Sequence, residues 1–314
     1  MPLPDHIPVL LDHVLDALAP QPGQTYADAT AGLGGHALEV ARRLGPTGHV
    51  VLNDVDPANL AHAETNLREA LGPDCPRLTA LLGNFADLPR RMIELGLGAD
   101  AILADLGFSS NQMANAARGL SFQTDAPLDM RLDPTLPTTA AGLVATLPVD
   151  ELTRILADYG EERHAHRIAR RLVEARTAGP IRTTFQLAEL VRAAQPRHPS
   201  SGDGIDPATR TFQALRIAVN DELGVLESLL ASIERAARAL SGAPPGRTWL
   251  APGARVALIS FHSLEDRLVK RAFADLVRAQ LAQDIGPRLR RADEDELRVN
   301  RRARSARLRA VHLR

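Results

Sequence analysis

Cysteine, lysine and long apolar runs are all scarce in this sequence. Its 314 residues include a single cysteine, Cys75, so no disulfide can form within the chain, and this fits a reducing compartment. No stretch reaches the roughly 18 uncharged apolar residues that a membrane-spanning helix needs. The opening, Met1 to Leu15, carries Asp5 and Asp12 and lacks the basic region of a secretory signal. We therefore expect a cytoplasmic protein with no membrane partner.

Positive charge comes almost entirely from arginine, because Lys270 is the only lysine. Arginine binds phosphate in bidentate fashion, but a GC-rich genome produces the same bias, and we favour that simpler cause. The net charge is −1, yet residues 1–103 hold thirteen acids against six arginines, and residues 286–314 hold ten arginines against four acids. A basic end on a neutral protein is typical of nucleic-acid binding, and a solvated surface helix explains it equally well.

Strand and helix patterns alternate through the first third of the chain. Strands are expected at 25–30, 49–54, 78–82 and 100–105, with helices at 36–44, 58–71 and 86–95. This alternation predicts βαβ units and a parallel sheet. A chain of this length also predicts about two domains.

The alternation then stops and returns only near the end of the chain. Residues 107–150 look irregular, 151–195 look helical, and 208–240 look like one long helix or two in series. A strand at 255–261, a helix at 263–281 and a strand at 305–313 resume the pattern. We expect an α/β domain, residues 1–110 and 207–314, with a mainly helical substrate-recognition domain inserted at 111–206.

The clearest local motif is the glycine-rich turn from Asp28 to His36, which contains Gly32, Gly34 and Gly35. Such a turn between strand and helix lets a ligand approach the backbone and the N–H groups of the helix start. With Ala37 it also satisfies the loose dinucleotide pattern G-x-G-x-x-G/A.

Two carboxylates refine the interpretation of this turn. Asp54 lies about 20 residues after the glycines, where an acid binds ribose hydroxyls. Asp28, at the tip of the first strand, is not expected of a dinucleotide site and suits a cationic amine, such as the methionine end of S-adenosylmethionine. The plainer alternative is that Asp28 caps the turn and Asp54 caps the next helix.

A third carboxylate, Asp105, closes the fourth strand in the run Asp105 to Ser110. In open α/β sheets, ligands bind beyond the carboxyl ends of the strands, so Asp28, Asp54 and Asp105 should converge on one site. Phe85 follows the third strand, where its ring could pack on adenine or join the core.

Several longer runs now bring the chain close to a known family. They are Asp28 to His36, Asp105 to Ser110, Gly119 to Phe122, Pro127 to Arg131, Tyr159 to Arg163, Ala208 to Arg216 and Ser260 to Arg267, with His6 to Asp12 and Arg302 to Ser305 near the ends. In this order they resemble the motifs of the bacterial ribosomal-RNA cytosine-N4 methyltransferases, over nearly the whole chain.

The resemblance implies a Rossmann-like class I methyltransferase core with an inserted helical domain. It implies cofactor contacts at Gly34, Gly35, His36, Asp54, Phe85, Asp105 and Gln112. The chain departs from the family at Ala31 and Leu33 in the turn, and at Asn53, where isoleucine is usual. These departures concern packing around the cofactor and leave the glycines and acids intact.

The same resemblance implies transfer of a methyl group from S-adenosylmethionine to the N4 amine of a cytidine in the decoding region of 16S rRNA. The partner would be that RNA, presented in an assembled small ribosomal subunit. No metal is expected, and the oligomeric state stays open, a homodimer included.

The amine of cytosine is a poor nucleophile, so an enzyme must orient it and accept its hydrogen bonds. Our hypothesis is that Asp105, or the carbonyls beside it, holds the amine while Phe108 stacks on the base. Asp105 could instead serve mainly the cofactor.

Further candidates for substrate binding lie elsewhere in the chain. Asp129 and Arg131 could order a lid, or Arg131 could hold a phosphate. Arg163 could follow the RNA backbone, or simply belong to a solvated helix face. His262 could be a base, but we favour a capping role, with Ser263 and Asp266 as the capping box.

Three other functions compete with this one. A methyltransferase acting on DNA, protein or a small molecule would share the cofactor site but not the motifs of the insert. An NAD-dependent oxidoreductase would not need Asp28 or the run that begins at Asp105. A non-catalytic RNA-binding protein would be expected to lose the glycines of the turn, and all are present.

Overall fold

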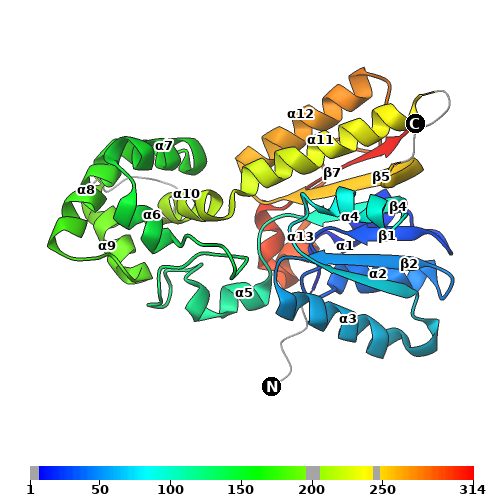
Figure 1. The fold of residues 1–314 in the computed structure, drawn as a ribbon, viewed down its shortest axis with the longest axis horizontal. Coiled ribbons are helices and arrows are strands. Elements are labelled where there is room, and N and C mark those ends of the chain that lie inside the picture. Colours follow the sequence, from blue (N-terminus) through cyan, green and yellow to red (C-terminus); the bar gives the residue numbers. More distant parts are fainter. Residues whose placement is uncertain (1–6, 196–205, 243–247) are drawn as a thin grey trace. The chain divides into compact units, whose positions relative to one another are not determined.

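The computed structural model of the chain describes residues 7–195, 206–242 and 248–314 (Figure 1). His6, the first residue of the opening motif, lies outside these ranges. The chain separates into two compact units. The first unit is Met1–Gly107 with Leu223–Arg314, and the second unit is Phe108–Glu222.

A single sheet organises the first unit. Within the described ranges it has seven strands in the order β3-β2-β1-β4-β5-β7-β6. Their bounds are β1 Thr25–Asp28, β2 His49–Asp54, β3 Arg77–Leu82, β4 Ala99–Asp105, β5 Leu250–Ser260, β6 Ala282–Asp284 and β7 Arg307–Leu313. Strands β1 to β5 pair in parallel, and only β7 pairs antiparallel with its neighbours β5 and β6. The predicted mostly parallel, Rossmann-like sheet is confirmed.

Helices cover both faces of this sheet (Figure 1). They are α1 Leu11–Leu18, α2 Gly35–Leu44, α3 Pro57–Leu71, α4 Leu88–Glu94, α11 Glu222–Leu240, α12 Ser263–Arg278 and α13 Glu294–Val299, with the 3₁₀ helices η1 Gly72–Asp74 and η3 Arg301–Ser305. Side chains alternate along each strand: Val50 and Leu52 pack with α1, α2 and α3, whereas Val51 packs with α4, α11 and α12. One apolar layer therefore packs on each face of the sheet. Because the strands are parallel, their carboxyl ends lie at one common edge.

The second unit is helical and has its own core. Its helices are α5 Ser110–Ala114, α6 Ala140–Thr146, α7 Val149–Gly160, α8 Ala165–Ala178, α9 Thr184–Ala194 and α10 Ala208–Asn220, with the 3₁₀ helix η2 Ala116–Arg118. The apolar stripe of α8, with Ile168 and Leu172, is buried against Phe212 and Leu215 of α10 and other residues of that core. No helix within the described ranges of the chain is long and apolar enough to cross a membrane.

The structure corrects several boundaries. Of the two alternatives for 208–240, the structure has two helices in series, because Asp221 adopts a left-handed conformation with φ of 48° between α10 and α11. The prediction that the chain returns to the α/β domain at residue 207 is wrong. Helix α10 packs on α7 within the second unit, and the first unit resumes at Leu223. Strand β5 begins at Leu250 rather than at 255, because the sequence Pro252-Gly253 conceals its start, and the three-residue β6 has no recognisable pattern.

Candidate functional site

The glycine-rich turn joins β1 to α2 and depends on backbone shapes that only glycine adopts easily. Gly32 and Gly34 have φ of 52° and 82°. A Cβ on Gly34 would lie 3.0 Å from Cα of Ala63 in α3, and one on Gly35 would lie 2.7 Å from Cγ of Pro8. Gly34 is the N-cap of α2 and provides no side-chain cap, so the first N–H groups of the helix can bind a ligand, as is typical of helix N-termini.

Asp28 is buried at the tip of β1. Its carboxylate accepts hydrogen bonds from the Tyr26 hydroxyl at 2.9 Å and from the Thr30 N–H at 3.2 Å. Burial raises the pKa of Asp28 to about 6, against the opposing effects of His36 and of the Tyr26 hydrogen bond. Turn capping therefore explains the contact with Thr30 but not the contact with Tyr26, and the interaction with His36 is the largest effect that opposes burial of this carboxylate.

Asp54 ends β2 and is tied to the glycine turn. Its Oδ2 accepts from the Gly32 N–H at 2.8 Å, and its Oδ1 accepts from the Asp56 N–H at 2.8 Å. The residue that caps α3 is Asp56, whose side chain accepts from the Ala58 N–H. The alternative in which Asp54 caps the next helix is therefore wrong, and burial raises its pKa.

Asp105 ends β4 next to the same turn. Its backbone N–H donates to Thr30 Oγ1 at 2.7 Å, and its Oδ2 lies 3.9 Å from Nδ1 of His36. Among the described residues no group hydrogen-bonds its buried Oδ1, although the side chain as a whole is 24% exposed. Burial, opposed by the charge of Arg302 and reinforced by Glu265, raises the pKa of Asp105 to about 7.

His36 connects these acids to the N-terminal segment. Its Nε2 lies 2.8 Å from the carbonyl oxygen of Val9. Because a carbonyl only accepts, Nε2 must carry the proton, and Nδ1 faces Asp105 as an acceptor. Burial lowers the pKa of His36, which makes the neutral form the dominant one.

The contacts show the predicted convergence of three acids, Asp28, Asp54 and Asp105, around the glycine turn. His36 lies beside them, next to Asp105. Burial raises the pKa of all three acids, Asp28, Asp54 and Asp105, and lowers that of the imidazole beside them. A ligand with positive charge would offset the cost of burying these carboxylates. This set of acidic side chains therefore fits S-adenosylmethionine, which carries a positively charged sulfonium and an amine.

Residues that sequence reasoning missed support this site from behind. The Asn53 amide is fully buried in β2 and donates to the carbonyls of Ala29 and Gly83, at 2.9 and 3.0 Å. It thereby ties together the tips of β1, β2 and β3. The only sequence signal was a polar residue in an otherwise apolar strand. Phe85, which follows β3, is half-buried and packs against the core, so both of its predicted roles stay open.

Phe108 and Gln112 belong to the second unit and are placed only within it. The guanidinium of Arg216 lies 4.9 Å above the Phe108 ring, and Glu222 holds that guanidinium through two bonds of 2.7 and 2.9 Å. The cation–π contact fixes the ring orientation. Gln112 accepts from the Ser109 N–H at 3.0 Å as part of a capping box at the start of α5.

Asp129 and Arg131 form a bidentate pair, with both bonds at 2.8 Å. Arg131 also donates to the carbonyls of Pro134 and Leu136. Most of its donors are thus used to order the segment that follows, which favours the first of its two predicted roles. Arg163 is exposed at the start of α8, and its part in RNA binding stays a prediction.

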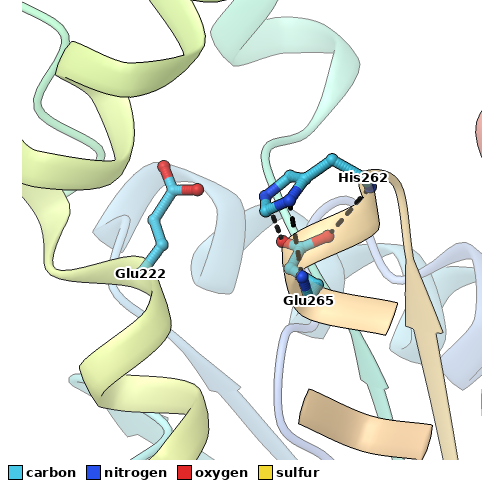
Figure 2. Close-up of side chains that lie close together, drawn as sticks. All are labelled: Glu222, His262 and Glu265. Atoms are coloured by element: carbon cyan, nitrogen blue, oxygen red, sulfur yellow. Dashed lines mark hydrogen bonds and ion pairs between the residues drawn. The ribbon is translucent and has the colours of Figure 1, made fainter. Parts of the chain in front are cut away.

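His262 is the N-cap of α12 (Figure 2). Its Nδ1 accepts from the Glu265 N–H at 3.4 Å, its Nε2 lies 3.3 Å from the Glu265 carboxylate, and that carboxylate accepts from the Phe261 N–H at 2.8 Å. The capping role is therefore confirmed, but the predicted box of Ser263 and Asp266 is wrong by one residue. Asp266 instead binds Arg307 and Arg309 of β7, which hold its pKa down.

Comparisons with known proteins agree with this geometry. Residues 4–314 match the model of the MraW methylase family. A ribosomal RNA small subunit methyltransferase H from Halorhodospira halophila is 49% identical, over 98% of this chain and 93% of its own. Proteins of the same name from Symbiobacterium thermophilum and Geobacter sulfurreducens are 45% and 44% identical, over 98% of this chain and 96% and 98% of theirs. The chain belongs to the MraW methylase family.

Proposed function

We propose that this methylase uses S-adenosylmethionine to methylate the N4 amine of a cytidine in the decoding region of 16S rRNA. The observation that carries the proposal is the cluster of three poorly solvated carboxylates, Asp28, Asp54 and Asp105, at the strand tips around the glycine turn. A site of this charge suits a cationic methyl donor, and the relatives that share almost the whole chain are named for ribosomal RNA of the small subunit.

The cofactor, when bound, supplies an electrophilic methyl group on a positively charged sulfur. Asp28 suits the amine of its methionine end, and Asp54 suits the ribose hydroxyls, since each carboxylate oxygen still has acceptor capacity beyond its backbone bond. The turn has no side chains at Gly32, Gly34 and Gly35, so the ligand can reach its backbone N–H groups. His36, Phe85 and Gln112 complete the cofactor-binding set implied by the family.

Asp105 has the best position for handling the target amine. Its Oδ1 is free of protein donors among the described residues and can accept a hydrogen bond from an N–H group. Accepting that bond favours build-up of positive charge on the amine as it attacks, which is where an enzyme gains rate. Phe108, whose ring orientation Arg216 fixes, is available to stack on the base.

The RNA would be bound in the cytoplasm, as part of an assembled small subunit. A base inside folded RNA must leave its stack to reach a buried carboxylate. Arg163, Arg167 and Arg170 are exposed around the start of α8 and can contact phosphates. The pair of Asp129 and Arg131 orders the neighbouring loop of the second unit, so that it can present its side chains to the substrate.

The decisive test is methyl transfer from labelled S-adenosylmethionine to small subunits that lack the modification, followed by nucleoside analysis. We expect N4-methylated cytidine, and we expect Asp54→Ala to abolish it. Cofactor binding without labelled RNA would contradict the substrate and redirect the search to DNA, proteins and small molecules. Absence of cofactor binding would contradict the whole proposal.

A further inference from the structure

The N-terminal strap, residues 7–10, lies directly on the glycine-rich turn. The carbonyl of Val9 accepts the His36 Nε2 proton at 2.8 Å. Pro8 packs so closely on Gly35 that a Cβ there would come within 2.7 Å of its ring. The strap therefore touches two neighbouring residues of the turn, one through a hydrogen bond and one through packing.

The strap is held in turn by α13 and the residue after it, about 290 positions later in the chain. The Glu296 carboxylate accepts from the Leu10 N–H at 2.6 Å, and the Asn300 amide donates to the carbonyl of Ile7 at 3.0 Å. Leu10 itself is left-handed, with φ of 55°. A leucine adopts that conformation only where surrounding contacts enforce it, and such enforced residues cluster at functional sites.

Glu296 differs from the other acids of its run in this respect. The side chains of Glu294 and Asp295 are 91% and 86% exposed, and each pairs with Arg298 on the same helix. Glu296 is only partly exposed and points its carboxylate at a backbone N–H of the strap. The sequence offered a solvated surface helix as one explanation of this charged region, yet Glu296 binds the strap that lies on the turn.

We infer that Glu296 and Asn300 are positioning residues for the cofactor, acting through the strap on His36 and Gly35. The inference rests on the proposed use of S-adenosylmethionine. With the strap held, Val9 keeps the proton of His36 on Nε2 and keeps Nδ1 turned toward Asp105. Without it, the imidazole can rotate and exchange its proton position, and the start of α2 loses the surface that supports Gly35.

The test compares Glu296→Ala with Glu294→Ala in the full chain, by calorimetric titration with S-adenosylhomocysteine and S-adenosylmethionine. Both variants remove one negative charge from the same helix, but only the first loses a strap contact. We expect Glu296→Ala to weaken cofactor binding about tenfold, as befits loss of one hydrogen bond to a charged acceptor. Glu294→Ala should bind within about twofold of wild type, as exposed pairs contribute little.

Two further variants separate positioning from simple support of the fold. Glu296→Gln keeps an acceptor oxygen for the Leu10 N–H and should restore most of the affinity. Asn300→Asp removes the donor to Ile7 but keeps the oxygen that accepts from the Arg302 N–H, so it should weaken cofactor binding without loosening η3. In steady-state assays the KM for the cofactor should rise more than kcat falls.

Melting temperatures measured alongside make the outcome decisive. Glu296→Ala and Asn300→Asp chains that melt earlier but bind the cofactor as wild type would overturn the inference and leave a purely structural clasp. A wild-type chain that binds no cofactor would overturn the inference together with the proposed function. A wild-type chain that binds the cofactor but methylates no 16S rRNA would overturn only the proposed substrate, and the titrations would still decide the role of Glu296.

Discussion

At the residue scale, Asp105 carries the main conflict between folding and function. Its pKa is raised to about 7, so the folded chain holds a proton there that the unfolded chain releases near pH 4. As the pH rises from about 4 to about 7, the unfolded state is increasingly favoured. Above pH 7 the buried charge lowers the free energy of unfolding by its full amount. Because we propose that Asp105 acts on the target amine, we interpret this poorly solvated carboxylate as an exchange of stability for activity.

We predict that Asp105→Asn stabilises the fold at pH 8 and removes methyl transfer. The gain in unfolding free energy has an upper limit of about 4 kcal/mol, from the size of the pKa shift, and will be smaller because solvent reaches part of the side chain. Urea unfolding at pH 5 and pH 8 measures it, and the gain should be much smaller at pH 5. Full turnover by this variant would rule out the catalytic role.

The contribution of the buried Asn53 amide to stability can also be tested by substitution. Its amide donates to the carbonyls of Ala29 and Gly83, so it acts as a buried donor between two acceptors. Asn53→Asp replaces that donor by an acceptor of the same size and should destabilise the chain by about 3 kcal/mol or more. Asn53→Ile, the residue usual in the family, should cost only about 1 kcal/mol, because it also removes the unpartnered Oδ1. Equal losses in denaturant unfolding would show that an acceptor placed against the two carbonyls costs nothing beyond the loss of the two hydrogen bonds.

At the element scale, the turn between β5 and α12 is a helix cap built from His262 and Glu265. The cap uses Nδ1 of the imidazole, whereas Nε2 lies 3.3 Å from the Glu265 carboxylate, is buried and has no hydrogen-bond partner among the described residues. We predict that His262→Ala costs about 1 kcal/mol of stability, as loss of an N-cap does, and lowers kcat by less than about tenfold. Thermal unfolding and single-turnover assays check the two parts. A loss of kcat beyond about a hundredfold, with a fold that is intact, would restore the general-base role.

The loop that follows Arg131 shows the same principle in the second unit. Its guanidinium joins Asp129 to the carbonyls of Pro134 and Leu136, which closes a segment rich in proline and aspartate. An irregular segment of this kind has few backbone hydrogen bonds of its own, so one arginine with several donors can order it. Arg131, a candidate phosphate contact in the sequence analysis, therefore serves first to order the loop that follows it.

At the scale of the whole molecule, much of the basic C-terminal region is neutralised within the chain. Arg290 is buried against Asp16, Arg307 and Arg309 bind Asp266, and Arg288 and Arg298 pair with nearby acids. The excess of positive charge there is therefore weak support for RNA binding. Arg163, just before α8, and Arg167 and Arg171 within it are exposed, and they are better placed to meet phosphates than Arg170, which pairs with Glu174.

We predict that Arg163→Ala combined with Arg167→Ala weakens binding to small subunits and lowers the salt dependence of that binding. Each lost phosphate contact should reduce the slope of log K against log salt by about 1. Affinity for the cofactor, measured by calorimetry, should not change, because neither residue belongs to the proposed cofactor-binding set. Arg298→Ala serves as the control, since that arginine already pairs with Asp295. An unchanged salt slope would place the RNA contacts elsewhere.

Local pattern was enough to predict the parallel sheet, the glycine turn and the acids at the tips of β1, β2 and β4. These features depend on side-chain alternation, on backbone conformations open only to glycine and on the common edge that parallel strands share. Motif resemblance added the family and the cofactor. Errors at β5, β6 and the end of the insert arose where strands were short, or where a left-handed Asp221 interrupted a helical pattern.

Tertiary structure alone decided which side chains complete the site. Asn53 bridges strand tips, Thr30 accepts from the Asp105 backbone, and Glu296 reaches Leu10 across nearly the full length of the chain. None of these contacts joins close neighbours in sequence, so no local periodicity announces them. The raised pKa values of Asp28 and Asp105 likewise come mainly from burial, which depends on packing of the complete domain.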